Sequence, residues 1–139
     1  MKKLILVLAL VVSLFGGVEE QIYALIIDAV FPQKHLVKVW VDDAKKREVF
    51  EHIRRVVLVR DAKEADMLFL YHEHKALQKC DDCIVFVGSY PLLLKTQKEA
   101  IGGFFWQKGR PNIIFLRKNL QARGIHLPKD FSKYIEDRP

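Results

Sequence analysis

The stretch Met67-Leu68-Phe69-Leu70-Tyr71 is a continuous apolar run with the length of a β-strand, and Ile84-Val85-Phe86-Val87 is a second. A third run precedes them at Val56-Val57-Leu58-Val59. Uninterrupted apolar runs are typical of strands that are covered on both faces, as in sheets of parallel strands. These runs therefore predict a central, largely parallel sheet.

The segments on the N-terminal side of these runs predict one further strand and two helices. Apolar residues within 22–29 recur at the spacing of one helix face, and Pro32 ends that helix. Residues 36–41 are expected to form a strand in which alternate valines share one face. A short charged helix over 44–53 follows this strand.

The last third of the chain has a different pattern. Residues 100–107 and 111–116 are separated only by Lys108-Gly109-Arg110, which is too short for a crossover between parallel strands. The spacing predicts an antiparallel hairpin. The pair Gly102-Gly103 predicts a bulge or close packing where the hairpin starts.

The C-terminal residues are expected to be helical. Residues 118–123 can form one or two turns that end at Gly124, and Pro128 suits the first turn of a final helix with Phe131 and Ile135 on one face. The predicted fold is a single three-layer α/β domain over residues 18–139. Its sheet is mixed but largely parallel and ends in a C-terminal antiparallel hairpin.

The N-terminus resembles an export signal. Lys2 and Lys3 precede an uncharged run from Leu4 to Val18, whose 15 residues are fewer than the about 20 that a membrane-crossing helix needs. We expect residues 1–17 to be a signal peptide that is removed near Gly17, so that the protein is periplasmic or otherwise exported. The alternative is an uncleaved segment that anchors the domain to the membrane.

The charge balance is moderately basic. The chain has 23 basic and 17 acidic side chains, a net charge of +6 that falls to +4 without Lys2 and Lys3. In an exported protein this excess favours anionic lipid headgroups or an acidic partner over nucleic acid. The simpler interpretation is a solvated basic surface.

Signatures of catalysis are missing from the sequence. It has no G-x-G-x-x-G, no P-loop and no G-x-S-x-G, although Ser89 follows Gly88 at the end of a predicted strand. We therefore expect no catalytic residues and no cofactor, and a protein that is not an enzyme.

The two cysteines, Cys80 and Cys83, lie two residues apart before the strand at 84–87. In an oxidising compartment a pair this close readily forms a disulfide, and we expect a structural one. A reversible redox pair is an alternative. Another is a metal site for zinc or copper, in which His72 and His74 join the two cysteines.

Aromatic and basic side chains gather in the predicted hairpin. Alternation places Phe104 and Trp106 on one face, with cations of the turn beside them. An aromatic anchor rimmed by positive charge is typical of protein contact sites. The expected partner-binding residues are Phe104, Trp106, Lys108 and Arg110, although both aromatic rows could also be buried.

The segment Ile101-Gly102-Gly103-Phe104-Phe105-Trp106-Gln107-Lys108-Gly109-Arg110, continuing to Leu127, resembles the C-terminal part of the YfiR-like periplasmic proteins. Shared features are the glycine pair, two apolar strands around Gly109-Arg110, and a short helix that ends in Gly124 and Ile125. The resemblance implies a small exported α/β protein that represses a membrane-bound diguanylate cyclase by binding its periplasmic part, with disulfides important to it. This chain departs from the family in its apolar Ile113-Ile114-Phe115 and in having fewer cysteines.

The function predicted from the sequence is that of an exported, non-enzymatic binding or regulatory protein. Its expected partner is the periplasmic domain of a membrane signalling protein. One alternative is an exported thiol redox protein that uses the C-x-x-C pair. The other is a small-ligand-binding protein that uses the carboxyl ends of the parallel strands near Asp42, His72 and Ser89.

Overall fold

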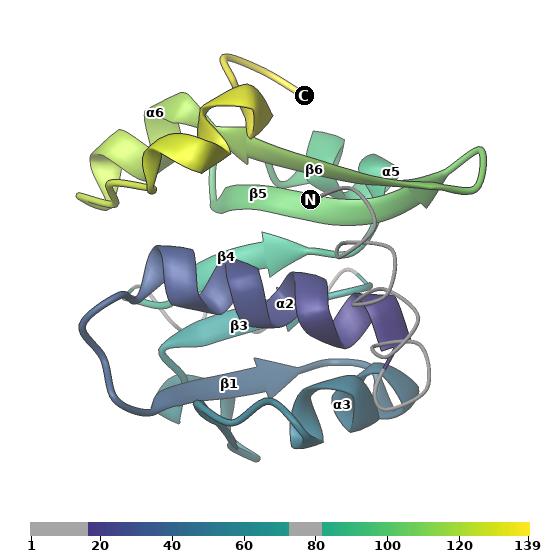
Figure 1. Ribbon diagram of the computed structural model, residues 1–139, viewed down its shortest axis with the longest axis vertical. Coiled ribbons are helices and arrows are strands. Elements are labelled where there is room, and N and C mark those ends of the chain that lie inside the picture. Colours follow the sequence, from purple (N-terminus) through teal and green to yellow (C-terminus); the bar gives the residue numbers. More distant parts are fainter. Residues whose placement is uncertain (1–16, 73–81) are drawn as a thin grey trace, which may run out of the picture.

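The fold, a computed structural model in which residues 17–72 and 82–139 are described, is built on one twisted sheet (Figure 1). The order of the strands is β2-β1-β3-β4-β5-β6-β7. Neighbours from β2 to β5 are parallel, β5 and β6 are antiparallel, and β7 is parallel to β6. The mixed, largely parallel sheet predicted from the sequence is confirmed. The strands are β1 Val37–Val41, β2 Val56–Leu58, β3 Met67–Leu70, β4 Ile84–Val87, β5 Ala100–Gln107, β6 Arg110–Leu116 and β7 Ile135–Glu136.

Helices lie on both faces of the sheet and give the domain three layers. On one face, α2 (Gly17–Val30) and α3 (Ala44–Glu51) cover a core that includes Tyr23, Phe50 and Phe69. On the other face, α5 (Tyr90–Lys95) and the 3-10 turn η1 (Ala62–Glu64) pack on a second core. Two shorter elements follow the hairpin, α6 (Arg117–Ala122) and the 3-10 helix η2 (Lys129–Tyr134).

Short polar residues begin the helices at the carboxyl ends of β1 and β4. The carboxylate of Asp43 accepts hydrogen bonds from the backbone N–H groups of Lys45 and Lys46, which caps α3. Ser89 caps α5 by accepting from the N–H of Leu92, and a proline occupies the first turn. The sequence does not predict the helix at 90–95, because six residues are too few to show a helical period.

Two expectations about the edges of the sheet are wrong. The run at 56–59 was expected to be covered on both faces, but β2 is an edge strand and Val57 is exposed. The final helix expected after Pro128 is the 3-10 helix η2, and Ile135 then begins β7. Pairing with Phe115 and Leu116 satisfies the backbone of Ile135 and Glu136 as a strand.

The hairpin and its glycines follow the prediction. Lys108 (φ 52°) and Gly109 (φ 73°) both adopt the left-handed region, as a two-residue hairpin turn requires. The register between β4 and β5 shifts next to Ile101, which is the expected irregularity. Gly102 leaves no room for a side chain, since a Cβ there would lie 2.1 Å from the carbonyl oxygen of Ile114. Of the helices described, none has both the length and the apolar character that crossing a membrane requires.

Candidate functional site

The outer half of the hairpin is where the predicted contact residues lie, but the fold separates them. In the β5–β6 register, Trp106 is opposite Pro111 and Gln107 is opposite Arg110. Residues directly opposite one another share a face of the sheet, and successive residues alternate. Trp106 therefore belongs to the face that α2 covers, whereas Arg110 belongs to the other face. The expected surface with Trp106 and Arg110 side by side is corrected by this register.

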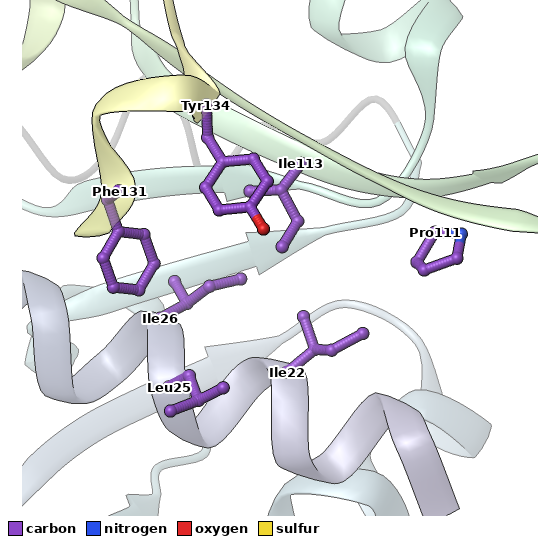
Figure 2. Close-up of a pocket in the computed structure, with 7 residues that line it drawn as sticks. All are labelled: Ile22, Leu25, Ile26, Pro111, Ile113, Phe131 and Tyr134. Carbon is purple, nitrogen blue, oxygen red and sulfur yellow. The ribbon is translucent and has the colours of Figure 1, made fainter. Parts of the chain in front are cut away.

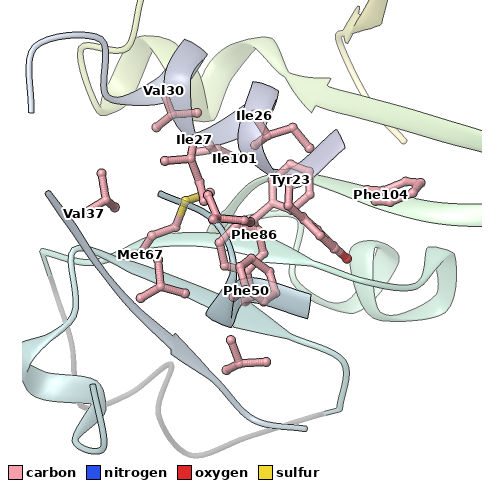
Figure 3. Packing of buried hydrophobic residues seen from close by; sticks show 14 of the residues in the cluster. Tyr23, Ile26, Ile27, Val30, Val37, Phe50, Met67, Phe86, Ile101 and Phe104 are labelled. Atoms are coloured by element: carbon pink, nitrogen blue, oxygen red, sulfur yellow. The ribbon is translucent and has the colours of Figure 1, made fainter. Parts of the chain in front are cut away.

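Phe104 does not lie on the surface. Its side chain is only 2% exposed and packs in the core beneath α2, where its ring lies 5.3 Å from that of Tyr23 (Figure 3). The ring of Trp106 lies 5.9 Å from that of Phe104 and is 48% exposed. Of the two aromatic residues expected in the contact surface, only Trp106 is available to a partner. Lys108, in the turn, and Arg110 are exposed as well.

Trp106 is held in place by the start of α2. Its indole N–H donates to the Glu19 carboxylate, with 3.1 Å between Nε1 and Oε1. The same carboxylate accepts from Lys46 of α3, whose Nζ lies 2.9 Å from Oε2. Glu19 thus joins the hairpin to two helices, and its position in the first turn of α2 suits a negative charge.

An apolar groove lies beside Trp106, between α2, β6 and η2 (Figure 2). Its volume is about 230 Å³. Leu25 on its wall is 56% exposed, and Pro111, the cross-strand neighbour of Trp106, lines the end toward the hairpin turn. The groove and Trp106 together form one apolar surface, called here the α2–hairpin surface. The groove is lined by Ile22, Leu25, Ile26, Pro111, Ile113, Phe131 and Tyr134.

A pair of tyrosines lies beneath the Glu19 contacts. The hydroxyls of Tyr23 on α2 and Tyr71 at the end of β3 are hydrogen bonded, and Lys46 lies 5.5 Å from the centre of the Tyr71 ring. Burial raises the pKa of both phenols well above the usual value near 10. Both hydroxyls therefore stay protonated at neutral pH, where they can donate and accept hydrogen bonds.

The carboxyl ends of β1 and β3 form the topological switch point of the sheet, where ligands bind in many α/β proteins. At this switch point the carboxylate of Asp42 accepts hydrogen bonds from the backbone N–H groups of Tyr71 (2.8 Å) and His72 (2.9 Å). Asp43 faces His72 at 3.2 Å, and hydrogen bonds from the Lys46 N–H and from His72 lower the pKa of its carboxyl. Asp42 and Ser89, two residues of the predicted ligand-binding alternative, both accept backbone hydrogen bonds that hold the ends of these strands.

Only some of the cysteines and histidines of the predicted disulfide and metal site lie within the described residues. Cys83 is buried at the start of β4, with its Sγ 3.1 Å from the carbonyl oxygen of Ala65. Cys80 and His74 fall outside the described residues, so the disulfide and the metal site with His72 both stay predictions. Among the described residues, no group of three or more potential ligand side chains could hold a metal ion.

Sequence reasoning missed the groove and the Glu19 contacts. The helix pattern over 22–29 included Ile22, Leu25 and Ile26 of the groove wall, but it identified them only as one apolar helix face. The available signal was that Ile22, Leu25 and Ile26, together with Tyr23 and Ile27, make α2 apolar around most of its circumference. Comparison with models of known protein families and with curated proteins finds no match.

Proposed function

We propose that this protein is an exported, non-enzymatic binding protein that recognises the external part of a membrane protein through the α2–hairpin surface. In this role it regulates the protein that it binds, as the resemblance to YfiR-like proteins implies. A diguanylate cyclase is the candidate partner from that resemblance.

The observation that carries the proposal is the exposure of Leu25 on the wall of an apolar groove and of Trp106, the cross-strand neighbour of the groove residue Pro111. Large apolar side chains that cluster at the surface mark sites of contact more often than single ones do. Trp106 is also fixed by its bond to Glu19, so little side-chain freedom would be lost on binding. Tryptophan is among the residues that contribute most to protein interfaces.

A photo-crosslinking residue in place of Leu25 tests the proposal in intact cells. We expect it to capture the external domain of one membrane protein, identified by mass spectrometry of the crosslinked product. The substitution Leu25→Asp should then reduce binding of the purified domain by about thirtyfold or more, because interface anchors typically contribute at least about 2 kcal/mol.

Leu94 provides a matched control. It is 42% exposed on α5, which lies on the opposite face of the sheet. Leu94→Asp should leave the captured partner unchanged. Equal loss of binding in the two variants, or capture only of cytoplasmic proteins, would contradict the proposal.

A further inference from the structure

In the part of the chain that the structure describes, no strand lies beside the outer edge of β6 along its first half. Among the described residues, β7 pairs with β6 only at Phe115 and Leu116, so residues 110–114 end the sheet on this side. The chain approaches β7 through η2, a 3-10 helix, and therefore does not continue the pairing upstream. An edge that is left open next to an apolar groove is a potential site for another strand.

The backbone groups on this edge can be assigned from the register of the hairpin. Gln107 and Arg110 flank the two-residue turn, and residues in that position exchange both backbone hydrogen bonds. Alternation then directs the N–H and C=O groups of Ile113 away from β5. The same alternation directs Phe115 outward, where it pairs with β7, which supports the assignment.

Pro111 belongs to the same outward-facing set. It has no N–H, so it offers only its carbonyl oxygen. No hydrogen bond engages the outward backbone groups of Ile113 within the described part of the chain. The open edge therefore presents one donor and two acceptors to an incoming strand.

The groove adjoins this edge, because the side chains of Pro111 and Ile113 line it. A segment lying along β6 would place alternate side chains over the groove. Its volume of about 230 Å³ is larger than the roughly 150 Å³ cavity, lined by similar residues, that holds benzene in another protein. One large aliphatic or aromatic side chain would fit.

Three cationic side chains lie near the open edge and the groove: Lys108, Arg110 and Lys133. Lys108 and Arg110 are exposed at the turn, and neither forms an ion pair within residues 17–72 and 82–139. Lys133 lies 5.1 Å from the centre of the Tyr134 ring at the other end of the groove. A segment with acidic residues beside an apolar anchor would complement these charges.

We propose that the partner binds by strand addition: an extended segment of it pairs with β6 at Ile113 and places one large apolar side chain in the groove. Acidic residues of the segment lie near Lys108 and Arg110. This inference rests on the proposed function and names the kind of segment that the α2–hairpin surface recognises. Backbone pairing would supply affinity and the groove would supply selectivity, as in other cases of strand addition.

The test uses the full chain and an acetylated peptide. In the centre of the peptide leucine and threonine alternate, and aspartates flank this centre on both sides. We expect calorimetry to detect binding, and the backbone amide of Ile113 to exchange its hydrogen at least about tenfold more slowly in the complex. Two further peptides carry N-methyl groups on alternate residues, on one edge or the other. Only the peptide methylated on the edge that faces β6 should lose affinity, by about tenfold or more.

Protein variants separate the edge from the groove. Ile113→Pro removes the outward N–H, whereas Ile113→Val keeps it with a similar side chain. Proline is tolerated where a strand N–H faces solvent, and melting temperature verifies the fold. We expect Ile113→Pro, and not Ile113→Val, to weaken peptide binding by about tenfold.

Strand addition is wrong if the peptide fails to bind at a concentration on the order of 1 mM, if both methylated peptides bind equally, or if Ile113 exchange is unchanged. A membrane partner that depends on Leu25 but tolerates Ile113→Pro would overturn strand addition and leave the proposed function standing. A partner that tolerates Leu25→Asp would overturn the proposed function, whatever the peptide does.

Discussion

The two halves of β5 have the same strand geometry but different environments. Residues 100–103 are buried, and Gly102 and Gly103 pair with both β4 and β6. Within residues 17–72 and 82–139, β6 is the one strand that pairs with residues 104–107, and β5 ends in two exposed residues, Trp106 and Gln107. In Figure 1 the hairpin accordingly extends beyond the neighbouring strands.

The comparison shows that a single strand can serve the core at its base and the surface at its tip. The base contains two glycines, because β4 and β6 approach it closely on either side. The tip contains large aromatic residues: α2 covers Phe104 on one face, Phe105 packs against Tyr90 of α5 on the other, and Trp106 is half exposed. Substitutions along this strand should therefore change from affecting stability to affecting binding between residues 104 and 106.

Phe104→Ala should cause the largest loss and locates the inner side of that boundary. The ring is buried against Tyr23, so its removal leaves a cavity beneath α2. We expect the free energy of unfolding to fall by about 3–5 kcal/mol, measured by denaturant titration. A loss below about 1 kcal/mol would mean that Phe104 behaves as a surface residue, and the proposed difference between the base and the tip of β5 would be wrong.

Gly102→Ala tests the base directly. A methyl group there meets the Ile114 carbonyl oxygen at 2.1 Å, so β5 and β6 would have to separate locally. Gly103→Ala is the matched control, since its closest contacts are 3.1 Å and include the movable side chain of Val87. We expect Gly102→Ala to lower the free energy of unfolding by about 2–3 kcal/mol and Gly103→Ala by less. The reverse order would show that β4, and not β6, limits the space at the base.

The sequence was sufficient for the elements whose signal is local. Continuous apolar runs indicated β3 and β4, and the short spacing around Gly109 indicated the hairpin. It was insufficient for β7, because two residues carry no period and become a strand only where β6 offers an edge. It also failed for the exposure of β2, since an edge strand of the sheet can be as apolar as a central one.

The candidate site consists of contacts between residues that are far apart in the sequence, so no local sequence pattern could predict it. Alternation correctly placed Phe104 and Trp106 on one face, but burial of the first and exposure of the second depend on where α2 begins. The bond between Trp106 and Glu19 joins residues that are 87 positions apart. The groove likewise combines α2, β6 and η2, which meet only in the folded chain.

The free energy of unfolding at alkaline pH should test the buried contacts of Tyr23, which packs against Phe104. Burial raises the pKa of Tyr23 and Tyr71 in the folded state, so their contribution to stability is complete below about pH 10 and is lost as pH rises above it. Each tyrosine should cost roughly 1.4 kcal/mol per pH unit in that range. Denaturant titrations from pH 9 to 11 should show this slope.

The double variant Tyr23→Phe with Tyr71→Phe provides the comparison. It removes both hydroxyls together, so neither is left without its partner, and it should flatten the slope above pH 10. An unaltered slope in the double variant would mean that other groups cause the alkaline loss.

Trp106→Ala should have the smallest effect on stability and locates the outer side of the boundary. The substitution removes the bond to Glu19 and the contact with Phe104, but Glu19 keeps its ion pair with Lys46 and no closed cavity forms. Because the indole is already 48% exposed, we expect a loss of only about 1 kcal/mol in unfolding free energy. The same variant should lose most partner binding, since the anchor is gone. A loss of stability close to that of Phe104→Ala would instead make Trp106 part of the core, and the tip of the hairpin would no longer be a free surface.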